Sequence, residues 1–346
     1  MRQTALIAAF LVWMTGTVCT AANAQELMGH RIEPDIGEPL RDASICRGPG
    51  GTFYLTGTTK INTLEPEHAD FQNNDGVRLW TSEDARSWED AGLVWNFATD
   101  PEFSGKNYAV GIWQTHMQIV PGRPDLGWCH GATSPEIHYL RDTFWILFSM
   151  NDKWVGLLKS KTGEAEGPYE EVGQLDLKRS LGADGSFFVD DGPAEEGGKP
   201  PVYLVWGEGY IARMEDDMSG LAEKPRSLQM TVEGYPMVQG ADSRCGARGA
   251  SLFKRERSYY LTFAAWNLRG GRGYLDTLIC RSESIYGPYS EPRIMVPDGG
   301  QASVWKGEDG TFRVTYSKDD HPLVEPLEWR DGLPAVQTPE GKGGQQ

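Results

Sequence analysis

The chain has 346 residues, of which 49 are acidic and 33 basic, so its formal net charge at pH 7 is −16. A field of this sign repels nucleic acid and excludes nonspecific nucleic-acid binding, whereas a neutral carbohydrate or a cation is compatible with it. The length exceeds that of a common single domain, although β-propellers and barrels reach it as one unit.

The N-terminus has the pattern of a cleavable secretion signal. Arg2 precedes the apolar run 5–14, and small residues end at Ala24. Ten apolar residues are about half of the ~20 that a membrane-spanning helix requires. We therefore predict a signal peptide over residues 1–24, a secreted or periplasmic mature protein, and no membrane association after cleavage. Removing the peptide takes away one arginine and leaves a net charge of −17.

One pattern recurs five times in the rest of the chain: a small residue, a short β-rich run, a polar turn, and a second, aromatic β-rich run. The copies begin at Ala43, Pro135, Gly185, Ala250 and Ala302. Aromatic and β-branched residues on both sides of a polar turn are typical of a β-hairpin. Because hairpins at this spacing match the repeats of a propeller, we predict an all-β, five-bladed β-propeller over residues 25–332.

Three further features bear on the propeller's organisation. Gly-Pro-Tyr occurs at 167–169 and 287–289 and marks outer strands, while 82–88 resembles an Asp-box turn of the rim. The widest gap between hairpins predicts an insertion over residues 62–133. Little of the chain shows a helical apolar period, so we expect low helix content. Residues 333–346 are rich in Pro, Gly and Gln and are predicted to be disordered.

The first strand of each blade lines the central channel of a propeller, so residues at the five hairpin entrances should converge. These entrances are Arg41-Asp42, Thr133-Ser134, Ala183-Asp184, Arg248-Gly249 and Gly300-Gln301. Asp42, Glu136 and Asp184 would thus gather carboxylates at one end of the channel. Inverting glycoside hydrolysis requires two carboxyl groups ~6.5–9.5 Å apart. The alternative is that each acid caps its own strand or binds a cation.

At these entrances the chain resembles glycoside hydrolase family 43, over about residues 35–320. The segment 41–45 is similar to the family's Asp-Pro-Ser-Ile, with Ala43 in place of proline, and 134–139 is similar to its Ala-Pro-Asp/Glu segment. The resemblance implies hydrolysis of arabinofuranosides, xylosides or galactosides by inversion. It makes Asp42 the general base, Glu136 the carboxylate that tunes the acid, and Asp184 a mainly structural aspartate.

The resemblance breaks in the fourth blade, where Arg248-Gly249-Ala250 stands at the family's Glu-Gly-Pro. A guanidinium stays protonated and cannot act as the general acid, but it suits a carboxylate or sulfate. Three interpretations remain open. Another acid acts, or an acidic or sulfated sugar is recognised by Arg248 and cut by a modified mechanism, or a glycan is bound without being cut. Elimination from a uronate that Arg248 neutralises is a further hypothesis. The candidate acids are His116, His130, His138, Glu208 and Asp242.

Other residues are candidates for substrate binding. Gln301 lies in the segment 299–303, which replaces a segment of the fifth blade that often holds a histidine in the family. No cofactor is required, and a structural calcium ion in the central channel is possible. Trp113, Trp128 and His130 lie near an axial entrance, and tryptophans there can stack on sugar rings or fill space between blades. Trp206 and Trp266 follow inner hairpins and are expected to pack.

Cysteine usage adds little to the functional prediction. Cys46, Cys129, Cys245 and Cys280 remain in the mature chain and allow three disulfide connectivities, of which Cys245–Cys280 is the first candidate. Buried free thiols are the alternative. The spacing matches no zinc site, so we predict no metal ligands among them. The sequence carries no signal for an oligomeric state.

Overall fold

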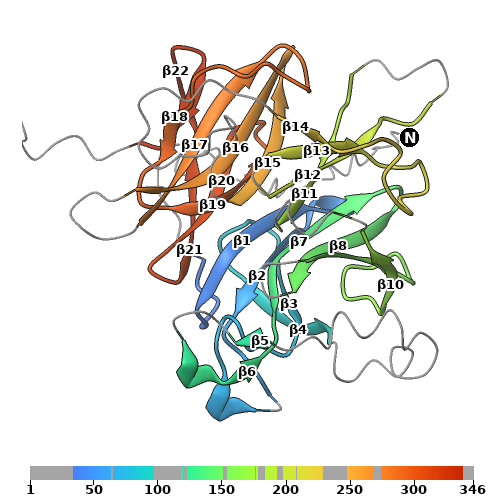
Figure 1. Cartoon of the computed structure of the whole chain (residues 1–346), viewed down its shortest axis with the longest axis vertical. Coiled ribbons are helices and arrows are strands. Elements are labelled where there is room, and N and C mark those ends of the chain that lie inside the picture. The colour runs from blue at the N-terminus through green and yellow to red at the C-terminus, as the bar shows by residue number, and fades with distance from the viewer. Residues whose placement is uncertain are drawn as a thin grey trace, which may run out of the picture.

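The computed structural model of the protein is built almost entirely from antiparallel β-sheets arranged around a common centre (Figure 1). It describes residues 34–63, 65–96, 118–119, 123–150, 154–175, 177, 184–192, 198–207, 209–228, 248–267 and 274–337. Within this part the helices are three 3-10 turns, namely η1 (Pro49–Gly51), η2 (Pro66–His68) and η3 (Pro124–Leu126). None of its helices is long and apolar enough to cross a membrane.

Five sheets form the blades, and each is numbered here by its order in the chain. Blade 1 contains β1 (Leu40–Arg47), β2 (Phe53–Thr59), β3 (Val77–Ser82) and β4 (Glu89–Trp95). Blade 2 contains β7 (Ala132–Leu140), β8 (Thr143–Met150), β9 (Trp154–Ser160) and β10 (Tyr169–Gln174). Blade 3 contains β11 (Gly185–Val189), β12 (Val202–Trp206), β13 (Tyr210–Arg213) and β14 (Arg226–Ser227).

The remaining blades follow the same plan. Blade 4 contains β15 (Arg248–Arg255), β16 (Ser258–Asn267), β17 (Tyr274–Ser282) and β18 (Arg293–Val296). Blade 5 contains β19 (Gly300–Lys306), β20 (Phe312–Lys318) and β21 (His321–Pro326). Two small hairpins lie outside the blades, one of β5 (Gln118–Ile119) and β6 (Trp128–Cys129), the other of β22 (Glu328–Arg330) and β23 (Leu333–Ala335). The predicted five-bladed β-propeller is confirmed.

The two faces of each strand serve two different blade interfaces. In β8, Phe144 and Ile146 face the core shared with blade 1, whereas Trp145 and Leu147 face the core shared with blade 3. Successive side chains of a strand point to opposite sides of its sheet. A strand covered on both sides therefore reads as a continuous apolar run, which is why the second strand of each repeat stands out in the sequence.

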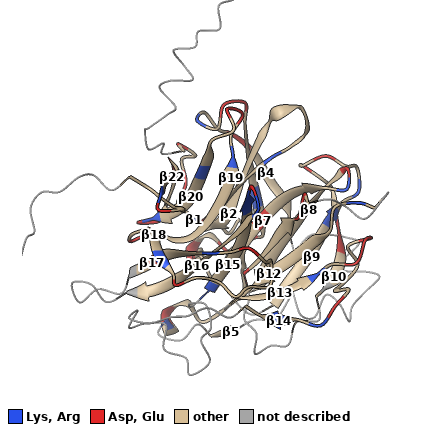
Figure 2. Ribbon diagram, turned by 90° about the horizontal axis from the view of Figure 1, so that it is seen from above, with Lys and Arg blue, Asp and Glu red and all other residues tan. Residues whose placement is uncertain are grey.

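The interfaces close into a ring. Five apolar clusters lie between blades 1 and 2, 2 and 3, 3 and 4, 4 and 5, and 5 and 1. In the last of these, Trp305 of β19 packs with Leu40 and Leu55 of blade 1. The Leu40 backbone N–H also donates to the Asp320 carbonyl oxygen at 2.8 Å. Many of the Lys, Arg, Asp and Glu residues lie in turns at the edge of the molecule (Figure 2).

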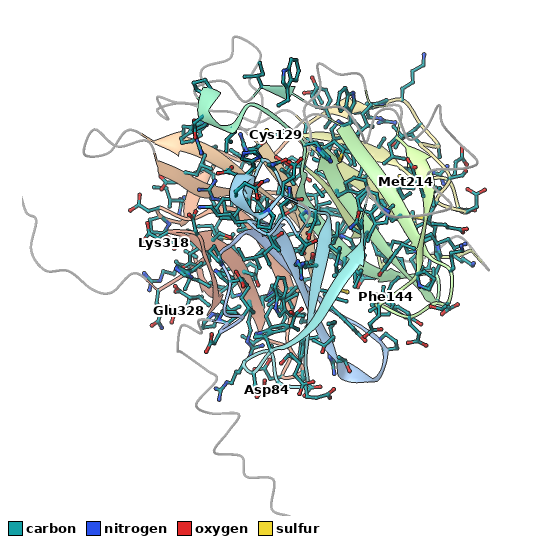
Figure 3. All side chains as sticks on the ribbon, turned by 90° about the horizontal axis from the view of Figure 1, so that it is seen from below. Asp84, Cys129, Phe144, Met214, Lys318 and Glu328 are labelled. Carbon is teal, nitrogen blue, oxygen red and sulfur yellow. The ribbon has the colours of Figure 1, made fainter. Side chains whose placement is uncertain are left out.

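All five inner strands begin at the same face of the propeller, which we call the pocket face. Each second strand ends there, since Arg41 pairs with Thr58 in blade 1 and Arg248 with Ala264 in blade 4. The connections between blades also start and end on this face. The opposite face carries the short turns, among them the β3–β4 turn. In Figure 3, Asp84 of that turn and Cys129 of β6 lie at opposite edges of the molecule.

The repeated Gly-Pro-Tyr segments lead into the outer strands β10 and β18, as predicted. The Tyr169 hydroxyl donates to the Ala165 carbonyl oxygen at 2.7 Å, and Tyr289 makes the same contact with Ile285 at 2.9 Å. In the Asp-box-like turn, the Asp84 carboxylate accepts hydrogen bonds from the backbone N–H groups of Arg86 and Ser87. Burial raises the pKa of Asp84, but these hydrogen bonds outweigh burial, and the pKa lies below its ordinary value.

Two predicted boundaries are wrong. The insertion over residues 62–133 is shorter than expected, because β3 and β4 complete blade 1 inside it and Trp80 and Trp95 fill the core. The tail does not begin at residue 333, because β23 pairs with β22 and Val336 is buried against blades 4 and 5. Residues 1–33 and 338–346 lie outside the described residues, so the signal peptide and the rest of the tail stay predictions.

The disulfide prediction also stays untested, because Cys245 lies outside the described residues. Its proposed partner, Cys280, is buried on β17, and the thiol contacts the Leu261 carbonyl oxygen at 3.6 Å. Burial raises the pKa of the Cys46 thiol to about 12. Cys46 is therefore held as a thiol in the folded protein at any physiological pH.

Candidate active site

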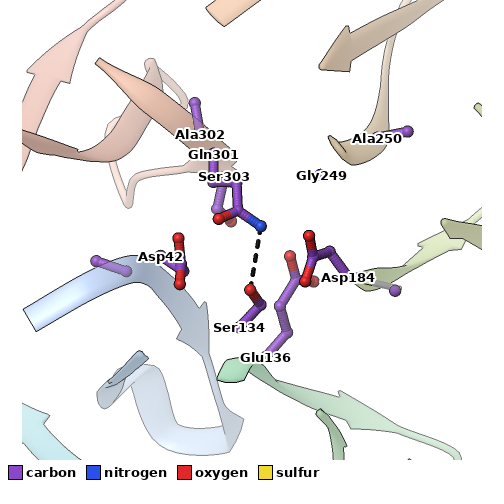
Figure 4. Close-up of a pocket in the computed structure, with 11 residues that line it drawn as sticks. Asp42, Ser134, Glu136, Asp184, Gly249, Ala250, Gln301, Ala302 and Ser303 are labelled. Carbon is purple, nitrogen blue, oxygen red and sulfur yellow. Dashed lines mark hydrogen bonds between the residues drawn. The ribbon is translucent and has the colours of Figure 1, made fainter. Parts of the chain in front are cut away.

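A polar pocket lies where the five inner strands begin (Figure 4). Every blade contributes one or more of its lining residues, which are Asp42, Ala43, Ser134, Glu136, Asp184, Gly185, Gly249, Ala250, Gln301, Ala302 and Ser303. The carboxyl groups of three different blades thus point into one pocket, although the residues are far apart in the sequence. The volume between these side chains is about 20 Å³, and the pocket opens to solvent.

A shared backbone device aims these side chains. Asp42, Ser134, Asp184, Gly249 and Gln301 occupy the same place in the five blades, and all have a positive φ, between 44° and 65°. In four blades the pairing register of the inner strand shifts across this residue, which is the mark of a β-bulge. A bulge bends the strand and redirects a side chain. Here it turns one residue of each blade toward the axis.

Thr58 of β2 connects the blade 1 carboxylate to blade 2. The Ser134 backbone N–H donates to the Thr58 hydroxyl oxygen at 2.7 Å, and the Thr58 hydroxyl donates to Asp42 Oδ2 at 2.6 Å. Because the hydroxyl accepts from the amide, its own proton is directed at Asp42. The Asp42 carboxylate is therefore held as a hydrogen-bond acceptor, the form that a general base requires.

Glu136 and His138 form a pair on β7. The His138 Nε2 and Glu136 Oε2 atoms lie 3.0 Å apart, and each side chain is 18% exposed. The two residues share a strand face because they are two positions apart. The Phe187 ring stands edge-on to the imidazole, with 5.4 Å between ring centroids, and orients it. One proton between these atoms satisfies the contact whether it is bonded to the carboxyl or to the imidazole.

Gln301 fills the blade 4 side of the pocket. Its amide nitrogen donates to the Ser134 hydroxyl at 3.1 Å. A Cβ atom at Gly249 would lie 2.6 Å from Gln301 Cγ, and Gly249 has a φ of +65°. Both the close approach and the left-handed backbone require glycine there. Blade 4 therefore presents backbone, rather than a carboxyl group, at its bulge position.

The structure brings together four of the predicted site residues, namely Asp42, Glu136, Asp184 and Gln301. Arg248 is half-buried as the first residue of β15, next to Gly249, and is not among the described residues that line the pocket. The chemical roles of the four residues in the pocket stay predictions.

The other candidates lie away from the pocket or outside the described residues. Trp128 is on β6 with 63% of its surface exposed. His130 is half-buried beside it, its backbone N–H donates to Asn73 Oδ1 at 3.3 Å, and burial lowers the pKa of its imidazole. Trp113, His116, Glu208 and Asp242 lie outside the described residues. Within the described part of the chain, no three His, Cys, Asp or Glu side chains are arranged so that they could hold a metal ion together.

Sequence reasoning missed the hydroxyl groups behind the pocket. The Ser149 hydroxyl of β8 accepts from the Asp184 backbone N–H at 2.8 Å, as Thr58 does for Ser134 one blade earlier. Ser317 of β20 similarly contacts the backbone N–H of Ala43 at 3.4 Å. These residues lie near the ends of the second strands of their blades. In the sequence, the only signal that could have identified them is a single hydroxyl residue among apolar residues.

Comparisons with known proteins agree with this architecture. The family model described as glycosyl hydrolases family 43 matches residues 33–334. An exo-1,5-α-L-arabinanase from a bovine ruminal metagenomic library is 16% identical, with a TM-score of 0.60 over 89% of this chain and 100% of that one. An endo-arabinase from Bacteroides thetaiotaomicron is 18% identical, with a TM-score of 0.60 over 88% and 99%. The arabinanase of Bacillus subtilis is 16% identical, with a TM-score of 0.59 over 88% and 99%.

At these identities the solved structures show a shared fold. A search of curated proteins finds no significant match. The family model, in contrast, spans most of the chain, from just before β1 to within β23, and includes all five blades. The chain therefore belongs to glycosyl hydrolase family 43.

Proposed function

We propose that this chain is a secreted glycoside hydrolase that removes terminal or side-chain sugars from a poly- or oligosaccharide by inversion. The observation that carries the proposal is the convergence of Asp42 and Glu136, from two different blades, on one pocket at the propeller axis. Family membership supports glycoside hydrolysis in general. The pocket supplies the two carboxyl groups that this chain in particular would use.

Asp42 is assigned the role of general base. It would take a proton from water as the water oxygen attacks the anomeric carbon, while the bond from that carbon to the leaving oxygen breaks. The hydrogen bond that Thr58 donates to Asp42 favours the carboxylate form, which this step requires.

Glu136 is assigned the role of proton donor. Arg248, which stands where the family carries its acid, cannot release a proton to the leaving oxygen. Glu136 lines the pocket and shares a hydrogen bond with His138. Once the Glu136 proton has passed to the leaving oxygen, the remaining carboxylate would accept the His138 N–H. Asp42 would release the proton it gained to solvent, Glu136 would take up a proton from solvent, and the cycle would close.

Glycan binding without cleavage is the second candidate function. It is favoured by one observation, which is that blade 4 offers Gly249 at its bulge position and Arg248 beside it, with no carboxyl group at either. An arginine near the pocket would also suit an acidic or sulfated sugar. In that case the protein would hold such a glycan and release no product.

One experiment separates these possibilities. The mature protein is incubated with neutral, uronate-containing and sulfated oligosaccharides, and released sugars and bound ligands are measured. We expect release from one class and its loss, by a factor of about 10² or more, in Asp42→Asn. Asp84→Asn, which changes a carboxylate on the opposite face, is the matched control and should keep full activity. Binding with no release from any glycan would replace hydrolysis by the second candidate function.

Secretion rests on the N-terminal pattern alone. We expect the protein purified from the medium or periplasm of a bacterial host to begin at Gln25, the residue after the small-residue motif. Mass spectrometry of the intact protein measures this directly. A mature N-terminus at residue 1 in the cytosol would contradict the proposal.

A further inference from the structure

Large apolar side chains that remain exposed are few, and most of them gather on one face. Among the described residues they are Ile119 at 52%, Trp128 at 63%, Trp266 at 41% and Ile294 at 37% exposed. The two tryptophans expose far more surface than Trp206, which is fully buried. Trp266 was expected to pack like Trp206, and that expectation is wrong. An exposed tryptophan leaves apolar surface in water, and covering that surface with a ligand is favourable.

The strand register places Trp266 at the pocket face. Arg248, the first residue of β15, pairs with Ala264 of β16, and β16 continues past this point to Trp266. Trp266 pairs across the strands with Leu275 of β17. Cross-strand partners project from the same side of a sheet. Trp266 and Leu275 therefore lie beyond the edge of the inner strand, on one side of blade 4.

That side faces the pocket rim of blade 5. A Cβ atom at Gly300 would lie 2.8 Å from Leu275 Cβ, so Leu275 packs against the start of β19. The next residue, Gln301, lines the pocket. Leu275, the cross-strand neighbour of Trp266, thus lies between the exposed indole and the pocket wall.

Trp128 stands on the same face but on the far side of the ring. Its strand, β6, is followed directly by β7, which leads to the pocket residue Ser134. Asn74 anchors this corner to blade 1, because its amide nitrogen donates to the carbonyl oxygens of Thr59 and Ala132. Trp266 therefore lies beside the pocket on blade 4, and Trp128 lies beside it at the junction of blades 1 and 2.

The carboxyl groups of the pocket are placed for the one sugar ring whose bond would be cut. Further rings of the substrate then lie at and beyond the pocket mouth, on the face where the tryptophans are. The C–H face of a sugar ring packs on the face of an indole and removes apolar surface from water. The strongly acidic composition of the chain favours an uncharged ring for this contact.

We propose that Trp266 is a substrate-stacking residue that binds a second, uncharged sugar ring, so that the substrate is a neutral chain of two or more sugars. This inference rests on the proposed function, since it assigns a further contact to the same site. It gives Trp266 a role in specificity for chain length, and none in the bond-breaking step.

Two readouts test Trp266. Affinity is measured in the Asp42→Asn background for neutral arabinan- and xylan-derived oligosaccharides of one to six sugars, and kcat/KM is measured on the same series and on 4-nitrophenyl monoglycosides. Trp266→Ala should weaken binding of the longer oligosaccharides roughly tenfold, with little change for monoglycosides. Trp266→Phe should recover most of the loss, because it keeps an aromatic face. Ile294→Ala, which removes an exposed apolar residue from the outer strand β18, should change neither value.

The outcomes separate the two proposals. Equal binding of every oligosaccharide by Trp266→Ala and the parent protein would overturn the stacking role. A parallel loss on monoglycosides would overturn it too, because the change would then disturb the pocket. If the parent protein binds oligosaccharides but cleaves none, hydrolysis fails, and a chain-length-dependent loss in Trp266→Ala still supports stacking. If no neutral oligosaccharide binds, the stacking proposal is overturned, and release from a uronate-containing or sulfated glycan would still support hydrolysis.

Discussion

The buried hydroxyl of Thr58 makes two hydrogen bonds to residues of this pocket. Thr58 accepts from the Ser134 amide and donates to Asp42, so it ties the general base of blade 1 to the bulge of blade 2. Thr56, two residues earlier on β2, is equally buried, but its hydroxyl donates to the Arg78 carbonyl oxygen, outside the pocket. The two threonines are therefore a matched pair that separates catalysis from folding.

Replacing Thr58 by the isosteric valine should lower kcat about tenfold or more, because Asp42 loses the donor that orients it. It should also cost about 1–3 kcal/mol of unfolding free energy, since the Ser134 amide loses its acceptor. Steady-state kinetics and urea unfolding measure the two effects. Thr56→Val should lower stability similarly and leave kcat unchanged. Equal losses of kcat in both variants would mean that Thr58 supports the fold alone.

The role of Glu136 as proton donor predicts a dependence on the leaving group. Glu136→Gln keeps a hydrogen-bonding partner for His138 but has no acidic proton. Its kcat on an oligosaccharide should fall about 10²–10⁴-fold, whereas a dinitrophenyl glycoside, whose leaving oxygen needs little protonation, should be hydrolysed within about tenfold of the parent rate. Asp42→Asn should lose activity on both substrates. An equal loss on both by Glu136→Gln would make it a positioning residue instead.

At the scale of the element, the bulge and the turn are the devices that shape each blade. The β19–β20 turn of blade 5 is closed by Arg313, whose guanidinium donates to both Asp309 carboxylate oxygens, at 3.0 and 2.8 Å. The arginine side chain is almost fully buried and lies over the Trp305 ring. This ion pair therefore joins the turn to the core between blades 5 and 1.

The Arg313 hydrogen bonds lower the pKa of Asp309 from 3.8 to about 2, against the opposing effect of burial. Because the folded-state pKa is the lower one, the stability contributed by the pair is present above pH 3.8 and is lost as the pH falls toward 2. The melting temperature of the native protein should thus exceed that of Asp309→Asn at pH 5, and the difference should shrink by pH 2.5. Thermal melts at the two pH values measure this. A difference that does not change with pH would rule out the ion pair as its source.

On the scale of the whole molecule, the five interfaces form a closed ring, so each blade is packed on both sides. Leu55 lies in the interface of blades 5 and 1, and Leu147 in that of blades 2 and 3; both are fully buried. A linear repeat array has ends that can unfold separately. A closed ring has none, and its interfaces should be lost together.

Leu55→Ala and Leu147→Ala should each cost about 2–5 kcal/mol, because each leaves a cavity in a packed interface. In both variants urea unfolding should remain one transition, with tryptophan fluorescence and circular dichroism changing at the same midpoint. Separate midpoints in Leu55→Ala alone would show that the junction of blades 5 and 1 is a seam that opens independently.

The sequence by itself determined the five hairpins and the positions that meet at the axis. Strand pairing follows a local period of two residues, and each repeat begins with a small residue at the same place in the hairpin. Once five such hairpins close into a ring, Asp42, Glu136, Asp184 and Gln301 must converge. For this reason these residues were accessible from pattern alone.

Tertiary structure alone decided what surrounds them. Thr58 and Ser149 bond to the bulge of the next blade, and no pattern within one hairpin reveals that neighbour. Trp206 and Trp266 occupy similar places in sequence, yet Trp206 pairs with Gly185 inside its sheet, while Trp266 lies two residues beyond the last partner of β15. The burial of each tryptophan depends on how far its strand extends past the neighbouring strand. That length is set by packing between blades.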